Sequence, residues 1–370
     1  MVDISFLKKF KKPSFSFDFL TGKPTRVVGI DIGMFSVKVV QLRYEGERAI
    51  LETYGELLSE QYFKNAEQIT GGGFLRYLDN DVATLLKDVL RESNVTAKEA
   101  VLSVPATASF VTPISFPRLS EKELESAIPL EARKYVPIPL SEVILDWDVL
   151  ETEGEKDSIE VLLIAVSREV VEKFKRVAKL AEIIPLALEI ETFSLARSLA
   201  RYDMVPTALI NFGHTATTLT VVDKGRLQIS HSIGRGAQEL TKALERGLKV
   251  SAARAEALKR EVGMSERIEE REITSVMTPL VRALFAELER LLSLYNRKSP
   301  RKIQKVLLAG GGSNLQGMVE YVVSKFGVEV ARANPFGRIV SPVFMQPILR
   351  ELGPTFSVAV GLALREITTR

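Results

Sequence analysis

The chain has 370 residues, 46% of them hydrophobic and 26% charged, which is typical of a globular protein with a large core and long enough for two domains. It contains no cysteine and only two histidines, His214 and His231, so disulfide scaffolds and zinc sites made of thiolates or several histidines are excluded. The net charge of +3 is concentrated in residues 1–26, which sum to +4, whereas a nucleic-acid-binding protein would spread its basic surface more widely.

Residues 1–26 form a basic leader that has two interpretations. Phe6, Leu7 and Phe10 lie among four lysines, at spacings that would put them on one side of a short helix ending before Pro13. That helix could lie on an anionic membrane surface as a weak anchor; a disordered leader is the alternative. Because no run approaches the roughly 20 apolar residues of a transmembrane helix and no signal-peptide pattern opens the chain, we expect a cytoplasmic protein.

From Val27 the sequence predicts three strands joined by tight turns, and a later segment repeats this pattern. The first copy reads VVGIDIGMFSVKVVQLRYEGERAILETYGEL, and the second, at residues 208–236, reads ALINFGHTATTLTVVDKGRLQISHSIGRG. Asp31 precedes Gly46 by 15 positions and Asn211 precedes Gly225 by 14. Solenoid repeats recur every 20–50 residues or so, whereas this one recurs after about 180, so it indicates a duplicated domain.

Between the two copies, strands and helices alternate, which predicts a small inserted α/β lobe. Ser120 and Glu123 have the spacing of a capping box at the start of a helix, and Pro129 should kink that helix or end it early. The expected elements are a helix over 82–96, a strand over 100–106, the helix after Ser120, strands over VILDWDVL and IEVLLIAV separated by the acidic turn ETEGEKD, and a helix from Arg168 to Ala181.

After the second copy the sequence is mostly helical. GAQELTKALERGLKVSAARAEALKREVG is rich in charge pairs at helical spacing, and residues 273–297 predict a further helix that Pro300 would close. KVLLAGGGSNLQGMVEYVVSKFG predicts a strand, a glycine loop and a helix, and GPTFSVAVGLALRE predicts a buried final helix.

The turns of the two hairpins carry the first candidate site. Several backbone N–H groups in such a turn can converge on phosphate oxygens, although a glycine in one β-turn is more often a requirement of geometry. In the first turn, Asp31 could hold a hydrated Mg²⁺ and Lys38 could reach a phosphate as a point charge. The predicted phosphate-binding residues are Gly33, Met34, Phe35, Ser36 and Lys38 in the first loop and Gly213, His214, Thr215 and Thr217 in the second.

The two loops, followed by LAGGGSNLQG, resemble in their order the actin-like ATPase superfamily of actin, bacterial filament proteins, FtsA and sugar kinases. LEARKYVPIPLSEVILDWDV, LEIETFSLAR and ANPF at 333–336 are similar to the PilM family of type IV pilus assembly proteins. The resemblance implies an α/β fold of the actin-like, ribonuclease H-like duplicated and bilobed kind. The implied parts are the leader 1–26, a first subdomain 27–108, an inserted FtsA- and PilM-like α/β lobe 109–190, and a second half 191–370 with the nucleotide-binding subdomain.

The resemblance also implies a site for ATP and Mg²⁺. Asp31 and Asn211 would hold the metal, and Glu191, with Glu189 nearby, would position an attacking water unless it is a plain helix-surface carboxylate. Relatives usually have Asp where this chain has Asn211; since an amide carries no charge, we expect nucleotide binding with very slow hydrolysis or none. The residues implied to border adenosine are Gly234, Gly236, Glu287, Arg290, Gly310, Gly311, Gly312 and Asn314.

Two of these groups have plain alternatives. Glu287 and Arg290 could be a solvated charge pair on a helix, and Gly234 and Gly236 could form an ordinary turn.

In function, the resemblance implies a cytoplasmic scaffold, peripheral at the inner membrane, that docks the N-terminal cytoplasmic tail of a PilN-like bitopic inner-membrane protein. The expected partner groove is Val136, Pro137, Ile138, Pro139 and Leu140, which could instead be a rigid connector that fills its own core. The alternatives are an FtsA-like division filament protein, which would carry a C-terminal amphipathic helix where this sequence ends in ALREITTR, and a small-metabolite kinase on the same fold.

Overall fold

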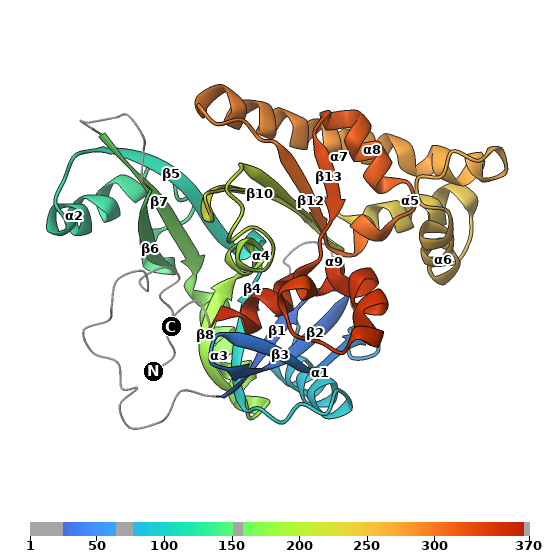
Figure 1. The fold of residues 1–370 in the computed structure, drawn as a ribbon, viewed down its shortest axis with the longest axis horizontal. Helices are drawn as coiled ribbons and strands as arrows, with labels where there is room; N and C mark the ends of the chain where they lie inside the picture. Colours follow the sequence, from blue (N-terminus) through green and yellow to red (C-terminus); the bar gives the residue numbers. More distant parts are fainter. Residues whose placement is uncertain (1–24, 64–76, 151–157, 366–370) are drawn as a thin grey trace. The chain divides into compact units, whose positions relative to one another are not determined.

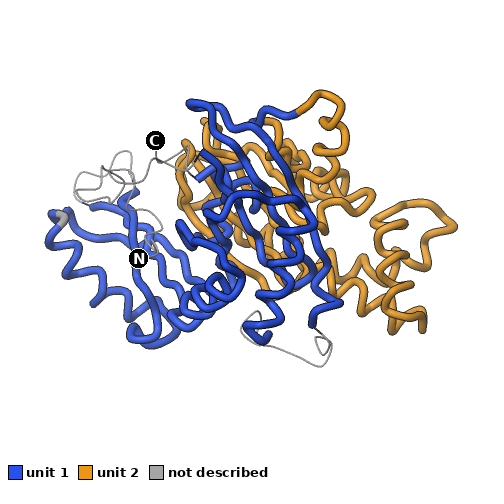
Figure 2. The backbone as a smooth tube through the Cα atoms, turned by 90° about the horizontal axis from the view of Figure 1, so that it is seen from below, with its two compact units in different colours: residues 1–198, 338–341, 358–370 blue, residues 199–337, 342–357 orange. Residues whose placement is uncertain are grey.

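The computed structural model describes residues 25–63, 77–150 and 158–365. Nearly all of the basic leader and the acidic turn ETEGEKD lie outside these residues. Among the described helices, none is both long and apolar enough to cross a membrane. The chain divides into two compact units, one formed by residues 1–198, 338–341 and 358–370 and the other by residues 199–337 and 342–357 (Figure 2).

The first unit contains a five-stranded sheet with the strand order β3-β2-β1-β4-β8 (Figure 1). Its first three strands form an antiparallel meander, and β4 and β8 add to it in parallel. The meander consists of β1 (Arg26–Ile32), β2 (Ser36–Glu45) and β3 (Arg48–Leu58), and the parallel strands are β4 (Glu99–Val104) and β8 (Ile184–Ile190). Helices α1 (Asp79–Glu92) and α3 (Arg168–Leu180) pack against each other beside this sheet.

The second unit repeats this topology with the strand order β11-β10-β9-β12-β13. Here too the first three strands are antiparallel and the last two are parallel. The strands are β9 (Thr207–Phe212), β10 (Thr217–Asp223), β11 (Arg226–Ile233), β12 (Lys305–Ala309) and β13 (Glu329–Arg332). The turns after β2 and β10 both place a glycine at positive φ, Gly46 at 63° and Gly225 at 73°, so the duplication predicted from the sequence is confirmed.

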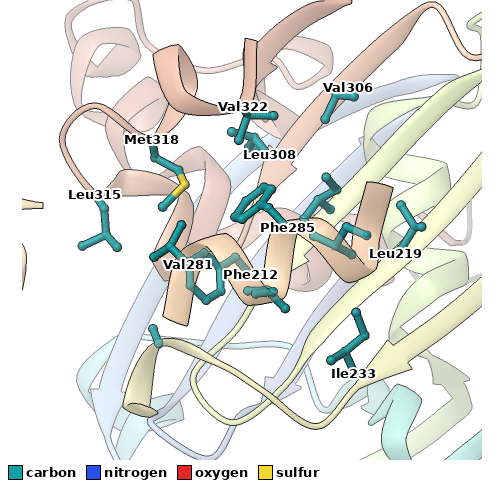
Figure 3. Close-up of a cluster of buried hydrophobic side chains, with 14 of the residues drawn as sticks. Phe212, Leu219, Ile233, Val281, Phe285, Val306, Leu308, Leu315, Met318 and Val322 are labelled. Carbon is teal, nitrogen blue, oxygen red and sulfur yellow. The ribbon is translucent and has the colours of Figure 1, made fainter. Parts of the chain in front are cut away.

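One face of the second sheet is covered by helices that bury the core shown in Figure 3. Phe285, fully buried in the middle of α7, meets the ring of Phe212 edge to face at 6.5 Å. Since Phe212 is the last residue of β9, this contact anchors the strand end from which the second hairpin loop starts. The helices of this unit are α5 (Ala237–Leu248), α6 (Ala252–Val262), α7 (Arg271–Lys298) and α8 (Met318–Phe326).

A three-stranded antiparallel sheet, β5-β7-β6, with helix α2 on one face, forms a separate lobe of the first unit. The predicted capping box is present, because Ser120 and Glu123 each accept the backbone N–H of the other. Pro129 does not end α2 early: the helix continues to Ala132, which is buried with Ile128 against the sheet. The elements are β5 (Ser109–Pro117), α2 (Glu121–Ala132), β6 (Val143–Leu150) and β7 (Ser158–Ser167).

The division of the chain differs from the predicted one, since residues 191–198, 338–341 and 358–370 of the predicted second half belong to the first unit. Strand β8, which we assigned to the inserted lobe, pairs in parallel with β4 and so belongs to the first five-stranded sheet. Helix α9 (Gln346–Ala363), which we assigned entirely to the second half, begins in the second unit and ends in the first. Its end packs closely there, since a Cβ on Gly361 would lie 1.9 Å from the Ser194 carbonyl oxygen in α4 (Glu191–Leu199).

Candidate functional site

The first hairpin loop joins β1 to β2 and is closed by a backbone hydrogen bond from Gly33 N to Ser36 O at 3.1 Å. A Cβ on Gly33 would lie 2.9 Å from the same oxygen, so a side chain at this position would open the turn. The strand register places Asp31 opposite Lys38. The loop therefore brings a carboxylate, an ammonium group and a tight backbone turn to one end of the hairpin.

The second loop, between β9 and β10, has the same internal geometry. Gly213 N donates to Ala216 O at 3.0 Å, and a Cβ on Gly213 would lie 2.8 Å from that oxygen. His214 is half-buried and Thr215 is exposed. Thr217 is fully buried, and its hydroxyl donates to Arg235 O at 2.8 Å, so this side chain ties the loop to the segment after β11.

Two carboxyl groups of the first unit, those of Asp31 and Glu191, interact electrostatically near the first loop. Burial raises the pKa of Glu191 to about 7, the nearby charge of Asp31 adds to this rise, and the N–H of Ala106 donates to Glu191 Oε1 at 2.9 Å. Burial also raises the pKa of Asp31, although Lys38 and a hydrogen bond from Ser103 oppose the rise. Because the two carboxylates repel each other, a cation bound near them would be stabilised.

Ser103 was not predicted from the sequence. Its hydroxyl donates to Asp31 Oδ1 at 2.9 Å and accepts the N–H of Ile32 at 3.2 Å. Ser103 lies on β4, which neighbours β1 in the sheet. The only signal in the sequence is a polar residue inside the apolar run AVLSVPA, which does not reveal its partner.

Glu189, which we expected near Glu191, is part of a buried ion cluster instead. Its two carboxylate oxygens accept from Arg197 at 2.6 and 2.8 Å, and Arg365 from the end of the chain donates to the same group. Burial alone would raise the pKa of Glu189, but the two guanidinium groups hold it below its ordinary value. Its hydrogen bonds thus join β8, α4 and Arg365, two residues after the end of α9.

The predicted phosphate-binding side chains of the first loop have a partner on β3. Ser36 is fully buried and donates to Glu56 Oε1 at 2.5 Å. Lys38 Nζ donates to Ser36 Oγ at 2.7 Å and lies 3.5 Å from Glu56 Oε1. Glu56 was also missed from the sequence, because its position opposite Lys38 depends on the register of β2 and β3.

The glycine-rich loop after β12 lies against the end of β9. Gly310 has a φ of 80°, and a Cβ there would lie 2.6 Å from Asn211 Oδ1. A Cβ on Gly312 would lie 2.4 Å from the ring of Phe212. Gly311 and Asn314 are exposed. The structure therefore brings the predicted adenosine loop and Asn211 together within the second unit.

The other predicted adenosine residues also lie in the second unit. Gly236 caps helix α5, whose first N–H groups donate to the carbonyls of Gly213 and His214 at 2.9 Å. Glu287 and Arg290 lie on α7, and within the part of the chain that the structure describes neither side chain forms an ion pair or a hydrogen bond. Their role at adenosine and the alternative of a solvated charge pair both stay predictions.

The predicted partner groove divides into buried and exposed parts. Val136 is buried in the core of the lobe, and Leu140 packs against that core. Pro137, Ile138 and Pro139 are exposed, with Ile138 at 40%. Only the Pro-Ile-Pro part presents a surface, while the two ends fill the lobe as the connector interpretation expected.

The residues present fit a weakly held Mg²⁺ ion. The described residues include no group of three or more acidic or histidine side chains that could hold a metal ion by themselves. Mg²⁺ keeps several waters and is usually bound by one or two carboxylates together with substrate phosphates. Asp31, oriented by Ser103, and Glu191, on which the charge of Asp31 acts, supply that smaller set.

A family model described as type IV pilus assembly protein PilM matches residues 29–367. Among curated proteins, the cell division protein FtsA of Rhizobium meliloti (strain 1021) is 30% identical over 180 residues, which cover 42% of this chain. The match covers only 39% of that FtsA chain, and the FtsA of Agrobacterium fabrum (strain C58 / ATCC 33970) matches to the same extent.

Three examples illustrate the solved structures that share this fold. A PilM-PilN type IV pilus biogenesis complex aligns with a TM-score of 0.77 and 24% identity, over 92% of this chain and 98% of that chain. The ethanolamine utilization protein EutJ from Carboxydothermus hydrogenoformans has a TM-score of 0.54 and 16% identity, over 92% and 90%. An MreB of Spiroplasma citri bound to AMPPNP has a TM-score of 0.52 and 13% identity, over 94% and 97%. The predicted actin-like α/β fold is confirmed.

Proposed function

The chain belongs to the PilM family of type IV pilus assembly proteins, and on that premise we propose that it is an ATP-binding scaffold of pilus assembly. The observation that carries ATP binding is the shared geometry of the two hairpin loops. Each is closed from a glycine N–H to the carbonyl three residues later, at 3.1 and 3.0 Å. Because the two duplicated sheets carry turns of the same geometry, we infer that the two turns share one function. Backbone turns of this kind bind phosphate oxygens.

In this proposal, the first loop binds phosphate through its backbone and Lys38, and Asp31 and Glu191 hold Mg²⁺. The ion would supply positive charge to the phosphate oxygens. Gly311 and Asn314, the exposed residues of the glycine loop, would border adenosine, with Glu287 and Arg290 of α7 beside it. Asn211 brings no charge to the metal, so we propose at most a very slow ATPase, because hydrolysis depends on firmly held metal charge.

The proposed partner is the N-terminal cytoplasmic tail of a PilN-like bitopic inner-membrane protein. A PilM-PilN complex is among the structures with the same fold, and Pro137–Pro139 on the lobe offer an exposed segment with an apolar side chain at its centre. Two prolines restrict the backbone of this segment, which lowers the entropic cost of binding. The proposal places this chain in the cytoplasm at the inner membrane.

The test is a pull-down of the whole chain with short tails of bitopic inner-membrane proteins, in ATP, in ADP and without nucleotide. We expect a PilN-like tail to be retained and Ile138→Asp to abolish its retention. Val323→Asp, which places the same charge at another exposed apolar position, on α8, is the matched control. Failure of every tail to bind would overturn the docking proposal, and calorimetry with ATP tests nucleotide binding separately.

An FtsA-like division filament protein is the second candidate, favoured by the 30% identity to FtsA over part of the chain. Sedimentation with and without ATP distinguishes the two. A scaffold stays in the supernatant, whereas a filament protein forms ATP-dependent polymers that sediment.

A further inference from the structure

The cation of the first loop is engaged by a carboxylate of the same unit. Lys38 lies 3.5 Å from Glu56 Oε1 and donates to Ser36, which itself donates to Glu56 at 2.5 Å. The Lys38 side chain is only 12% exposed and that of Glu56 is 32% exposed. Both phosphate-binding side chains of the loop are thus held by one acceptor on β3.

The charge balance around this group is negative. Asp31 lies opposite Lys38 in the hairpin register, and the charges of Lys38 and Glu56 act on the Asp31 carboxyl with opposite signs. Two carboxyl groups therefore share one ammonium group, and a polyphosphate that arrives without a cation would meet net repulsion.

We propose that Glu56 determines which form of the nucleotide this loop accepts, namely a nucleoside polyphosphate complexed with a divalent cation in preference to the free anion. This inference rests on the proposed ATP binding and adds a residue that selects the ligand form. While Glu56 is charged, Lys38 is neutralised and cannot by itself attract a polyphosphate. A bound divalent cation removes part of the ligand's negative charge and is itself attracted by the carboxylates.

The substitution Glu56→Gln isolates the charge. A glutamine amide oxygen can still accept the hydrogen bond from Ser36, but it no longer neutralises Lys38. Glu47→Gln is the matched control, since Glu47 is exposed in the turn at the other end of the same hairpin and its substitution changes the net charge equally. The two positions are nine residues apart along an extended strand, roughly 30 Å, so the control acts on the whole-protein charge alone.

The experiment measures ATP affinity by calorimetry in Mg²⁺ and in excess EDTA. We expect Glu56→Gln to tighten binding of cation-free ATP about tenfold, which corresponds to about 1.4 kcal/mol, and to change binding of Mg²⁺-ATP by less than threefold. Glu47→Gln should leave both affinities unchanged. If the glutamine variant does not fold, Glu56→Thr, a residue suited to a strand, should give the same selective gain.

The outcomes separate this inference from the proposal on which it rests. Equal affinities of wild type and Glu56→Gln in both solutions, or equal gains in both, would overturn the role of Glu56 and leave ATP binding intact. If neither wild type nor variant binds ATP in either solution, the proposed ATP binding is overturned together with this role.

Discussion

Ser103 Oγ donates to Asp31 Oδ1 at 2.9 Å and accepts the buried N–H of Ile32 at 3.2 Å, so one hydroxyl links β4 to two consecutive residues of β1. The first bond fixes the orientation of the proposed metal ligand. The second satisfies a backbone donor that has no access to water. These two roles predict two separable effects of removing the hydroxyl.

Ser103→Ala should destabilise the chain by about 1–3 kcal/mol, because the Ile32 N–H loses its acceptor in a buried place. It should also weaken binding of Mg²⁺-ATP, since Asp31 loses a donor that favours its charged form. Urea denaturation and calorimetry measure the two effects. Ser109→Ala removes a hydroxyl that donates only to the Ala106 carbonyl and should leave nucleotide affinity unchanged.

The raised pKa of Glu191 predicts that the free energy of unfolding depends on pH. Burial and the charge of Asp31 raise its pKa to about 7 from an ordinary value of 4.5, so the folded chain holds this proton more tightly than the unfolded chain. The resulting stabilisation is fully present below pH 4.5 and is lost as pH rises through about 7. Glu191→Gln stays neutral and can still accept the Ala106 N–H.

We therefore expect Glu191→Gln to be more stable than wild type at pH 8 by about 1–3 kcal/mol, with a smaller difference at pH 5.5. Urea denaturation midpoints at the two pH values check this. A difference that does not depend on pH would show that Glu191 is ionised in the folded chain throughout this range.

Mg²⁺ binding should depend on the same proton. If Asp31 and Glu191 hold the ion, a proton on Glu191 competes with it, and the apparent Mg²⁺ affinity in the presence of ATP should fall as the pH drops below about 7. Calorimetric titration of Mg²⁺ at pH 6 and pH 8 measures this change. In Glu191→Gln the affinity should be low at both pH values.

The sequence predicted the parts of the structure whose causes are local. Alternating apolar residues and a glycine at each hairpin turn identified the two meanders, and Ser120 with Glu123 identified the start of α2. Glu56, Ser103 and β8 were missed or misplaced because their roles depend on strand register and on neighbours far along the chain. Glu56 lies 18 residues from Lys38, and Ser103 lies 72 residues from Asp31.

The ion cluster around Glu189 includes Arg365, so we expect it to hold the end of α9 in the first unit. Arg365→Ala removes one of two guanidinium groups from a fully buried carboxylate, and breaking a buried ion pair on one side costs about 3–5 kcal/mol. Chemical denaturation measures the loss. Lys87→Ala, which removes the partner of an exposed ion pair with Glu182, should leave the denaturation midpoint unchanged.

Gly234 and Gly236 are only two positions apart and predict opposite results on substitution by alanine. A Cβ on Gly236 would lie 2.4 Å from His214 O and 2.8 Å from Ala216 N, whereas a Cβ on Gly234 meets nothing within 4 Å. Neither glycine has a positive φ, so backbone strain does not separate them. Gly236→Ala must therefore push the second hairpin loop away from α5.

We expect Gly236→Ala to weaken ATP binding at least tenfold and Gly234→Ala to retain the wild-type fold. If Gly234 also borders adenosine, as the family resemblance implies, Gly234→Ala should weaken ATP binding while leaving affinity for inorganic triphosphate unchanged, because that probe has no base or ribose. Equal affinity of Gly234→Ala and wild type for ATP would assign Gly234 to the turn alone. Calorimetry with the two ligands gives this result for both variants, and Gly236→Ala should lose affinity for both, since its effect acts on the loop that binds phosphate.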